Sequence, residues 1–279
     1  MPVNDELGRR MKDFYETIPK TKLMRRTPVA IRIDGKAFHT FTRGMKRPFD
    51  SILIETMQQT MKYLCENIQG CVLGYTQSDE ITLILIDYQK LTSSAWFDYE
   101  VQKMCSIAAS MATMAFNKCF TDNVAEYYYS IWDDAVEDWN APEEEIEYCK
   151  TLIDAGDKSA MFDARCFNIP KEEVANLIYW RQLDATRNSI QMVGQANFSH
   201  KELHSKSCSK IQDMLMLEKN INWNDFPAYQ KRGSCAIKQI KDISGGEGDY
   251  RTEWIIDKDI PIFKGEDRAY IEDLIYIGE

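Results

Sequence analysis

A short, strongly apolar hairpin is the feature of this sequence that most constrains its fold. Two β-rich runs, CVLGYTQ and EITLILID, occupy residues 71–87 and are separated only by Ser78 and Asp79. A two-residue connection between strand-forming runs is typical of a tight β-hairpin. The chain is therefore predicted to build an antiparallel sheet, with Asp79 at the tip of the hairpin.

Two further segments have strand character. Thr27 to Asp34 places Val29, Ile31 and Ile33 on one face, which is the period of a half-buried strand, and it ends in Asp-Gly. Ala160 to Ile169 returns to a strand-forming composition much later in the chain.

Helices are expected between these strands. Asp50 can cap a helix whose apolar residues recur at helical spacing up to Gly70, and a long buried helix is predicted from Trp96 to Phe120. The order is then β-α-β-β-α-β. This predicts an α+β fold of the ferredoxin-like or polymerase-palm kind, an antiparallel sheet backed by helices.

The rest of the chain is predicted to add helices and strands. Helices are expected over Lys171–Met192 and Ser199–Leu217, and late strands over Ser234–Ile240 and Arg251–Asp257, around a Gly245-Gly246 turn. We assign residues 1–170 to a palm-like catalytic region and residues 171–279 to a C-terminal region that completes the same unit.

Charge is distributed unevenly, although the net charge is −10. Residues 1–47 carry twelve Lys or Arg against five Asp or Glu, and residues 121–157 carry twelve acids and one base. We interpret 122–157 as an acidic helical insertion, with a helix start at Pro142. Residues 181–240 are basic again, nine against five, with His200 and His204 in addition, so they could supply a second contact region for phosphates or be an ordinary solvated surface.

Several classes of protein are disfavoured. No run approaches the roughly 20 apolar residues of a membrane span, and the N-terminus lacks the apolar core of a signal peptide, so we expect a cytoplasmic protein with no membrane partner. The eight cysteines are scattered without a CxxC pair. They indicate reduced packing thiols rather than a zinc site or a disulfide framework.

Asp34 and Asp79 are the candidate metal ligands. In a ferredoxin-like sheet the end of the first strand and the tip of the hairpin lie at one edge, so both carboxylates converge there. Mg²⁺ prefers hard oxygen ligands, usually one or two carboxylates with substrate phosphates, and a pair of ions can stabilise in-line displacement at phosphorus. Taken singly, Asp34-Gly35 and Ser78-Asp79 are more typical of simple turns, but their places at the ends of the correct elements favour the metal site when they are taken together.

Six segments carry a resemblance to a known family. The segments are IRIDGKAFHTFT (31–42), RPFD (47–50), GYTQSDEITLIL (74–85), FDAR (162–165), YWRQLDATRNSI (179–190) and YQKRGS (229–234). Together they resemble the tRNA-His guanylyltransferase family and its tRNA-repairing relatives. The family implies a polymerase-like palm that adds nucleotides to the 5′ end of RNA in the 3′-to-5′ direction. It also implies a tRNA or tRNA-like substrate, ATP and GTP or another NTP as substrates, two Mg²⁺ ions and a homotetramer built as a dimer of dimers.

One segment departs from the eukaryotic pattern. Where those guanylyltransferases have a His-Ile-Asn-Asn-Leu-Tyr type motif, this chain has Thr186 to Gln191, TRNSIQ, without the histidine. This is similar to the guanylyltransferase-like branch, so the resemblance favours template-dependent 5′-end repair. Dedicated addition of the extra guanylate of tRNA-His is the alternative.

The resemblance also implies roles for individual residues. The metals would be held by Asp34, the Gly35 carbonyl and Asp79, with Glu80 beside them as a catalytic residue in the same motif. Nucleotide and triphosphate contacts are expected from Arg32, Lys36, Ala37, Phe38, His39, Lys46 or Arg47, Ser78 and Arg165. RNA contacts are expected from Trp180, Arg181, Arg187, Asn188, Lys231 and Arg232. His39 and Trp180 are also compatible with packing roles.

Two other classes of function remain open from the sequence. A nucleotide cyclase could use the same palm, but the sequence lacks a Gly-Gly-Asp/Glu-Glu-Phe type hairpin. A non-catalytic RNA-binding module could use the same sheet, but it would carry aromatic residues on the central strands, where this chain has Asp79 and Glu80.

Overall fold

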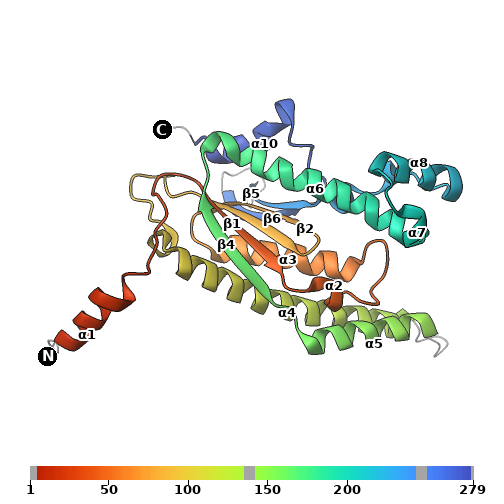
Figure 1. Cartoon of the computed structure of the whole chain (residues 1–279), viewed down its shortest axis with the longest axis horizontal. Helices are drawn as coiled ribbons and strands as arrows, with labels where there is room; N and C mark the ends of the chain where they lie inside the picture. The colour runs from red at the N-terminus through yellow and green to blue at the C-terminus, as the bar shows by residue number, and fades with distance from the viewer. Residues whose placement is uncertain (1–4, 135–141, 243–249, 278–279) are drawn as a thin grey trace.

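A six-stranded antiparallel sheet forms the centre of the molecule, in the order β4-β1-β3-β2-β5-β6 (Figure 1). The computed structural model describes residues 5–134, 142–242 and 250–277. The strands are β1 (Val29–Gly35), β2 (Cys71–Gln77), β3 (Glu80–Leu85), β4 (Phe162–Asn168), β5 (Ser234–Asp242) and β6 (Tyr250–Asp257). The first four take the order 4-1-3-2, so the predicted palm-like α+β fold is confirmed.

One face of the sheet is covered by α3 (Ser51–Asn67) and α4 (Val101–Asp134) (Figure 1). Alternate strand residues point into this layer, among them Ile31, Ile81 and Leu83, which are fully buried. Burying a side chain of this size contributes about 1.5–3 kcal/mol. The alternation that predicted the strands therefore marks the main core.

The opposite face is covered by α6 (Lys171–Asn197) and α10 (Ala269–Ile275). Ala30, Tyr75 and Ile84 pack there against the first half of α6. The second half of α6 runs past the sheet, where a separate small core gathers around Val193 and Leu215. The other helical elements are α1 (Glu6–Met11), η1 (Lys12–Glu16), α2 (Phe38–Phe41), η2 (Trp96–Tyr99), α5 (Glu143–Lys158), α7 (His200–Leu203), α8 (Cys208–Lys219), η3 (Trp223–Asp225), α9 (Ala228–Arg232) and η4 (Gly265–Arg268).

Three predicted helices have different boundaries in the structure, and the one expected over Lys171–Met192 continues to Asn197 as α6. The helix expected from Trp96 begins at Val101, because Phe97, Asp98 and Tyr99 adopt left-handed backbone angles that a right-handed helix cannot continue, and it extends to Asp134.

The single helix expected over Ser199–Leu217 is instead two helices, α7 and α8. Ser205 lies at a positive φ of 58° between them, and the side chain of Ser207 caps α8 by accepting a hydrogen bond from Lys210.

The acidic segment is partly an extension of α4 and partly the separate helix α5. Pro142 is the N-cap of α5, as the sequence predicted, and α5 buries Tyr148 and Leu152 against the molecule. Residues 135–141 of this segment and the predicted Gly245-Gly246 turn lie outside the described residues.

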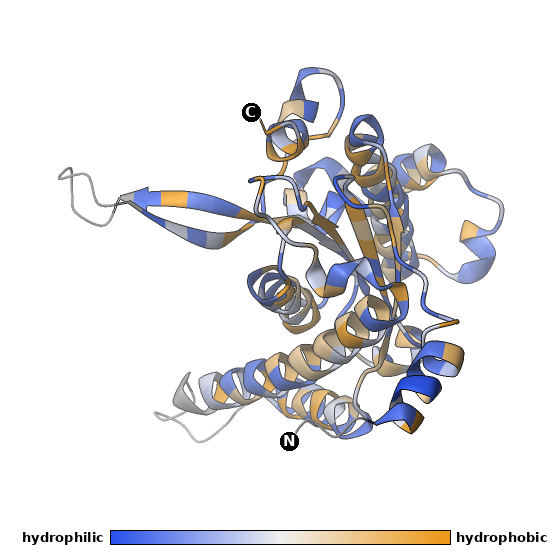
Figure 2. Ribbon diagram, turned by 90° about the vertical axis from the view of Figure 1, so that its left-hand side faces the viewer, coloured by the Kyte–Doolittle hydropathy of each residue, from blue (hydrophilic) through white to orange (hydrophobic). Residues whose placement is uncertain are grey.

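The two late strands extend the palm sheet rather than forming a separate unit. β5 pairs with β2 through residues 234–236 and then with β6 along its length. Figure 2 shows these two strands running out from the body as a two-stranded arm. None of the helices in the described ranges is long and apolar enough to cross a membrane.

Candidate active site

Asp34 and Asp79 lie at the same end of neighbouring central strands. β1 pairs with β3 so that Asp34 is opposite Glu80, and the backbone amide of Gly35 donates a hydrogen bond to the backbone carbonyl oxygen of Asp79 at 3.1 Å. Ser78 and Asp79 form the whole connection between β2 and β3. The fold thus brings together the two carboxylates that the sequence singled out.

The turn after β1 is fixed by a close contact between Gly35 and Phe38. A Cβ atom on Gly35 would lie 2.2 Å from the Phe38 ring, so only glycine permits this approach. The Phe38 side chain is buried in an aromatic cluster with Phe41, Phe116 and Phe162, with ring centroids 5.3–5.4 Å apart. The side chain expected to contact nucleotide is therefore a core residue that holds the turn next to Asp34.

The other residues of this turn are exposed. Lys36, Ala37 and His39 all face solvent, and Ala37 has a left-handed φ of 54°. The Lys36 amide donates to the Met161 carbonyl oxygen at 2.8 Å, which ties the turn to the start of β4. The Lys36 and His39 side chains remain available to a ligand beside Asp34.

Burial and neighbouring carboxylates raise the pKa values of both aspartates. Burial, and then the negative charges of Glu80 and Asp163, raise the pKa of Asp34, while Arg165 and Arg32 oppose the shift. Burial also raises the pKa of Asp79; the hydrogen bond from Ser78 lowers it, and Asp34 and Glu80 raise it further. A divalent cation would relieve this repulsion, and these hard oxygen donors fit Mg²⁺.

The donor set fits a cation that shares its ligands with a substrate. In the described parts of the chain, no three His, Cys, Asp or Glu side chains are grouped so that they could enclose a metal ion. Asp34, Asp79 and the Gly35 carbonyl would therefore supply some of the ligands. Mg²⁺ sites of this kind are completed by water and substrate phosphates.

The Glu80 carboxylate is bound by arginine side chains rather than left free. Its carboxylate pairs with Arg32 at 3.3 Å, accepts a hydrogen bond from the Gln77 amide at 3.1 Å, and forms an ion pair with Arg181. Arg181 is only 4% exposed and also pairs with Asp184 at 3.0 Å. Arg181, expected to contact RNA, is thus buried beneath the site, where it positions Glu80.

A fourth carboxylate of the site, Asp163, was not singled out from the sequence. It lies opposite Asp34 in the pairing of β1 with β4, and Arg165 lies opposite Arg32. Arg165 pairs with Asp163 at 2.9 Å. The FDAR motif contained this signal, since residues two apart on a strand share a face.

Trp180 and Arg187 lie on α6, near the charged side chains that surround the two aspartates. The Arg32 guanidinium lies 5.4 Å from the centroid of the Trp180 ring, and Trp180 is 51% exposed, so its ring is available for stacking. Arg187 is exposed and pairs with Asp184. Asn188 and Ser78 line one cavity of about 80 Å³ beside the hairpin tip.

Lys46 and Arg47 face different surroundings. The Lys46 ammonium binds Glu145 at 2.9 Å and the Tyr127 hydroxyl at 3.0 Å, so it engages α4 and α5. Arg47 lines a cavity of about 560 Å³ formed with α6, α7 and the start of α8. The structure does not bring Lys46 or Arg47 into contact with Asp34 or Asp79.

Lys231 and Arg232 line a further cavity of about 490 Å³. The aromatic side chains of Tyr179 and Trp223 share this cavity, and the Lys231 ammonium lies 5.6 Å from the Trp223 ring centroid. The Arg232 Nε atom is buried without a hydrogen-bond partner in the described ranges. Basic side chains and aromatic rings in one cavity suit the binding of a nucleic acid.

Comparison with known proteins identifies related sequences and structures. The family described as tRNAHis guanylyltransferase matches residues 8–170. A structure described as a bacterial tRNA(His) guanylyltransferase-like protein in complex with ATP is 42% identical, with a TM-score of 0.77 and coverage of 98% of this chain and 100% of that one. A second, in complex with GTP, is 38% identical, with a TM-score of 0.74 and the same coverage. An uncharacterized protein of Acanthamoeba polyphaga mimivirus is 30% identical over 253 residues, 85% of this chain and 79% of that protein.

Proposed function

Because this chain belongs to the tRNAHis guanylyltransferase family, and is therefore a nucleotidyltransferase, we propose that it adds nucleotides to the 5′ end of tRNA in the 3′-to-5′ direction, directed by a template. The observation that carries this proposal is the pairing of β1 with β3, which sets Asp34 and Asp79 side by side. Family membership disfavours the nucleotide cyclase and the non-catalytic RNA-binding module.

The substrates follow from the family and from its nucleotide complexes. Relatives that are 42% and 38% identical have been solved with ATP and with GTP. We therefore assign ATP, GTP and other nucleoside triphosphates as substrates, together with tRNA. Arg32, Ser78 and Arg165 lie next to the aspartates or on the adjoining strand, where guanidinium groups can bind phosphate oxygens.

The aspartates, with the Gly35 carbonyl, would hold two Mg²⁺ ions. When bound, Mg²⁺ activates the attacking hydroxyl and neutralises charge on the leaving phosphate. The protein positions the metal ligands and places charged side chains around them. Gly35 and Phe38 fix the turn beside Asp34, the two-residue hairpin fixes Asp79, and Arg181 keeps Glu80 in place.

The proposed reaction has two steps. The 5′ monophosphate of the RNA first attacks the α-phosphorus of ATP, which releases pyrophosphate and leaves an adenylylated 5′ end. The 3′ hydroxyl of an incoming nucleoside triphosphate then attacks the 5′ phosphorus of the RNA, and AMP leaves. A 5′-triphosphorylated RNA enters at the second step, with pyrophosphate as its leaving group.

Template-directed repair is favoured over dedicated guanylate addition by the α6 segment Thr186 to Gln191. This segment lacks the histidine-containing motif of the eukaryotic enzymes; within it, Asn188 and Ser189 line the cavity beside the hairpin tip, and Gln191 lines the larger cavity. The two functions differ in their response to the template. Repair adds whichever nucleotide pairs with the 3′ strand, whereas dedicated addition inserts guanylate regardless of pairing.

The test uses a 5′-truncated tRNA, ATP, Mg²⁺ and each labelled nucleoside triphosphate. Wild-type protein should add the nucleotide complementary to the opposing base, and changing that base should change the nucleotide added. Asp79→Ala should abolish addition, whereas Asp154→Ala, which removes an exposed carboxylate on α5, should not. Wild-type extension rates by an Asp79→Ala protein that is folded by circular dichroism would overturn the proposal.

A further inference from the structure

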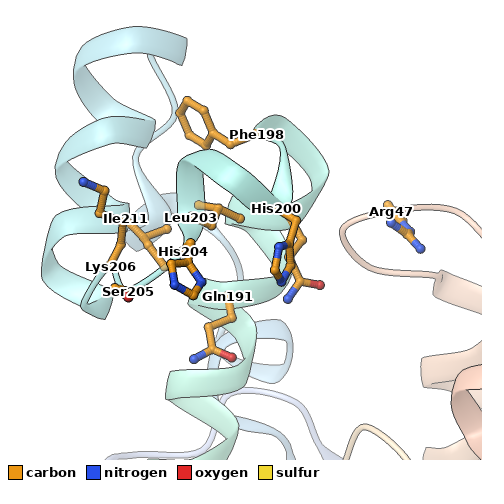
Figure 3. Close-up of a pocket in the computed structure, with 10 residues that line it drawn as sticks. Arg47, Gln191, Phe198, His200, Leu203, His204, Ser205, Lys206 and Ile211 are labelled. Carbon is orange, nitrogen blue, oxygen red and sulfur yellow. The ribbon is translucent and has the colours of Figure 1, made fainter.

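A cationic cavity lies away from the paired aspartates, between the loop that carries Arg47 and the far end of α6 (Figure 3). Its volume is about 560 Å³. Besides Ser205, its polar lining side chains come from that loop, from α6, from α7 and from the turn that follows α7: Arg47, Gln191, Gln195, His200, His204 and Lys206. We refer to it as the Arg47–Lys206 cavity.

The polar side chains that line this cavity can all donate hydrogen bonds, and none is acidic. Among the described residues, these six side chains form no hydrogen bonds or ion pairs, although the His200 and His204 rings lie 6.3 Å apart. Lys46, next in sequence to Arg47, is by contrast paired with Glu145. The cavity thus collects unpaired positive charge and free N–H donors, which is the chemistry that binds phosphate oxygens.

The walls of the cavity are fixed by packing. A Cβ atom on Gly194 would lie 2.8 Å from Ile211 Cγ2, so the glycine lets α8 approach α6 closely. Ser199 and Glu202 form a reciprocal capping box at the start of α7. Ile211 and Phe198, which line the cavity, are buried in the small core at this end of α6. The cavity is therefore preformed rather than a gap between mobile side chains.

One face of α6 connects the cavity to the candidate active site. Trp180, Asp184, Arg187, Gln191 and Gln195 are spaced three or four residues apart and so lie along one side of the helix. At 1.5 Å per residue, the first and last are separated by roughly 22 Å, the length of several stacked nucleotides. A strand that begins at the aspartates and follows this face reaches the cavity.

We propose that the Arg47–Lys206 cavity binds a backbone phosphate of the RNA substrate, several nucleotides away from the 5′ end that reacts. The proposal rests on the proposed function, because it takes RNA as the substrate. Phosphate chemistry is shared by RNA and free nucleotides. The length of the α6 face favours RNA, since a nucleoside triphosphate bound at the aspartates would not span it.

The test measures the affinity of the full-length protein for a fluorescently labelled 5′-truncated tRNA over a series of salt concentrations. Lys206→Ala should weaken binding roughly threefold to tenfold at low salt and reduce the slope of log affinity against log salt by about 0.7–0.9, the loss of one phosphate contact. Lys206→Glu should weaken binding further. Lys201→Ala is the matched control, because it removes the same charge from α7 outside the cavity lining, and it should bind as the wild type does.

Separate binding measurements with ATP and with GTP distinguish the source of the phosphate. The proposal predicts that Lys206→Ala leaves both nucleotide affinities within twofold of wild type. Equal losses of affinity for RNA and for nucleotides would assign the cavity to free nucleotides. Wild-type RNA affinity in both Lys206 variants would show that the cavity does not bind RNA. Either result overturns the proposal. If wild-type protein neither binds nor extends the tRNA, the proposed function itself fails, and this inference fails with it.

Discussion

The pKa shift of Asp34 links its ionisation to the stability of the folded protein, and a bound cation would offset the cost of that ionisation. Its pKa is raised in the folded chain, chiefly by burial and then by Glu80 and Asp163. Ionisation at neutral pH therefore costs folding free energy, and this cost disappears only as the pH falls below the unfolded value of about 3.9. The carboxylate that the proposed metal site needs therefore lowers the stability of the folded chain.

We predict that Asp34→Asn raises the melting temperature of the Mg²⁺-free protein at pH 7. Added Mg²⁺ should raise the melting temperature of wild type and have a much smaller effect on the variant, since the variant has lost a ligand. Differential scanning fluorimetry with EDTA or Mg²⁺ measures both. A lower melting temperature for the variant in EDTA would contradict this account of the site.

Arg181 and Arg187 form a matched pair of arginines, both bound to Asp184. Arg181 is 4% exposed and also holds Glu80, whereas the Arg187 side chain is 61% exposed. We predict that Arg181→Ala lowers the free energy of unfolding by roughly 2–4 kcal/mol, because it leaves Glu80 without its buried partner. Arg187→Ala should cost less than about 1 kcal/mol. Urea denaturation tests this, and equal losses would refute the positioning role of Arg181.

Sequence patterns placed some site residues and not others, for a structural reason. Asp34 and Asp79 end recognisable strands, so their place at one edge followed from the order of elements. The register of β1 with β4 brings Asp163 to Asp34. The packing of α6 on the sheet brings Asp184 to the site, where it pairs with Arg181. Register and packing between distant segments are not encoded in local periodicity; Asp163 could be found only from its place beside Arg165 in the FDAR motif, and no pattern marked Asp184.

At the scale of elements, Asp50 joins three parts of the molecule. Its side chain caps α3 by accepting from the Leu53 amide at 3.0 Å, accepts from the Lys46 amide at 3.0 Å, and accepts from the Tyr148 hydroxyl of α5. It is only 5% exposed. The helix start that the sequence predicted at Asp50 therefore also fixes the loop that carries Arg47.

We predict that Asp50→Ala lowers the free energy of unfolding by roughly 2–4 kcal/mol, because the cap is lost and a buried hydroxyl loses its acceptor. Tyr148→Phe keeps the cap and removes one hydrogen bond, so it should cost about 0.5–1.5 kcal/mol. Chemical denaturation compares the two variants. If both lose the same free energy, the backbone contacts of Asp50 contribute little.

Element boundaries were harder to predict than element types. Apolar residues recur at helical spacing through Leu203, Ile211 and Leu215, and the sequence therefore favoured one helix where α7 and α8 are separate. The break at Ser205 and the turn at Phe97 depend on backbone angles that side-chain periodicity does not report. The central strands were placed well, because their alternation continues through both buried faces.

At the scale of the whole molecule, the N-terminal segment projects from the body with apolar side chains exposed (Figure 1). Leu7, Phe14, Tyr15 and Ile18 are each at least 60% exposed. An exposed apolar surface of this kind commonly marks an interface. The homotetramer that the family resemblance implies would offer a place to bury it.

We therefore predict a solution mass near four times the 32.5 kDa of one chain by light scattering after size-exclusion chromatography. Replacing Phe14 and Ile18 with serine should lower the assembly state. Leu91→Ser, a control at a loop residue that is 93% exposed, should not. A monomeric wild-type protein would contradict the tetramer.

The central claim is that Asp34 and Asp79 share divalent cations. Electron paramagnetic resonance titration with Mn²⁺ in the presence of ATP tests it without reference to catalysis. Asp34→Asn and Asp79→Asn should each weaken Mn²⁺ binding by roughly tenfold or more, while Asp154→Asn binds as wild type does. Wild-type Mn²⁺ affinity and stoichiometry in either of the first two variants would contradict the claim.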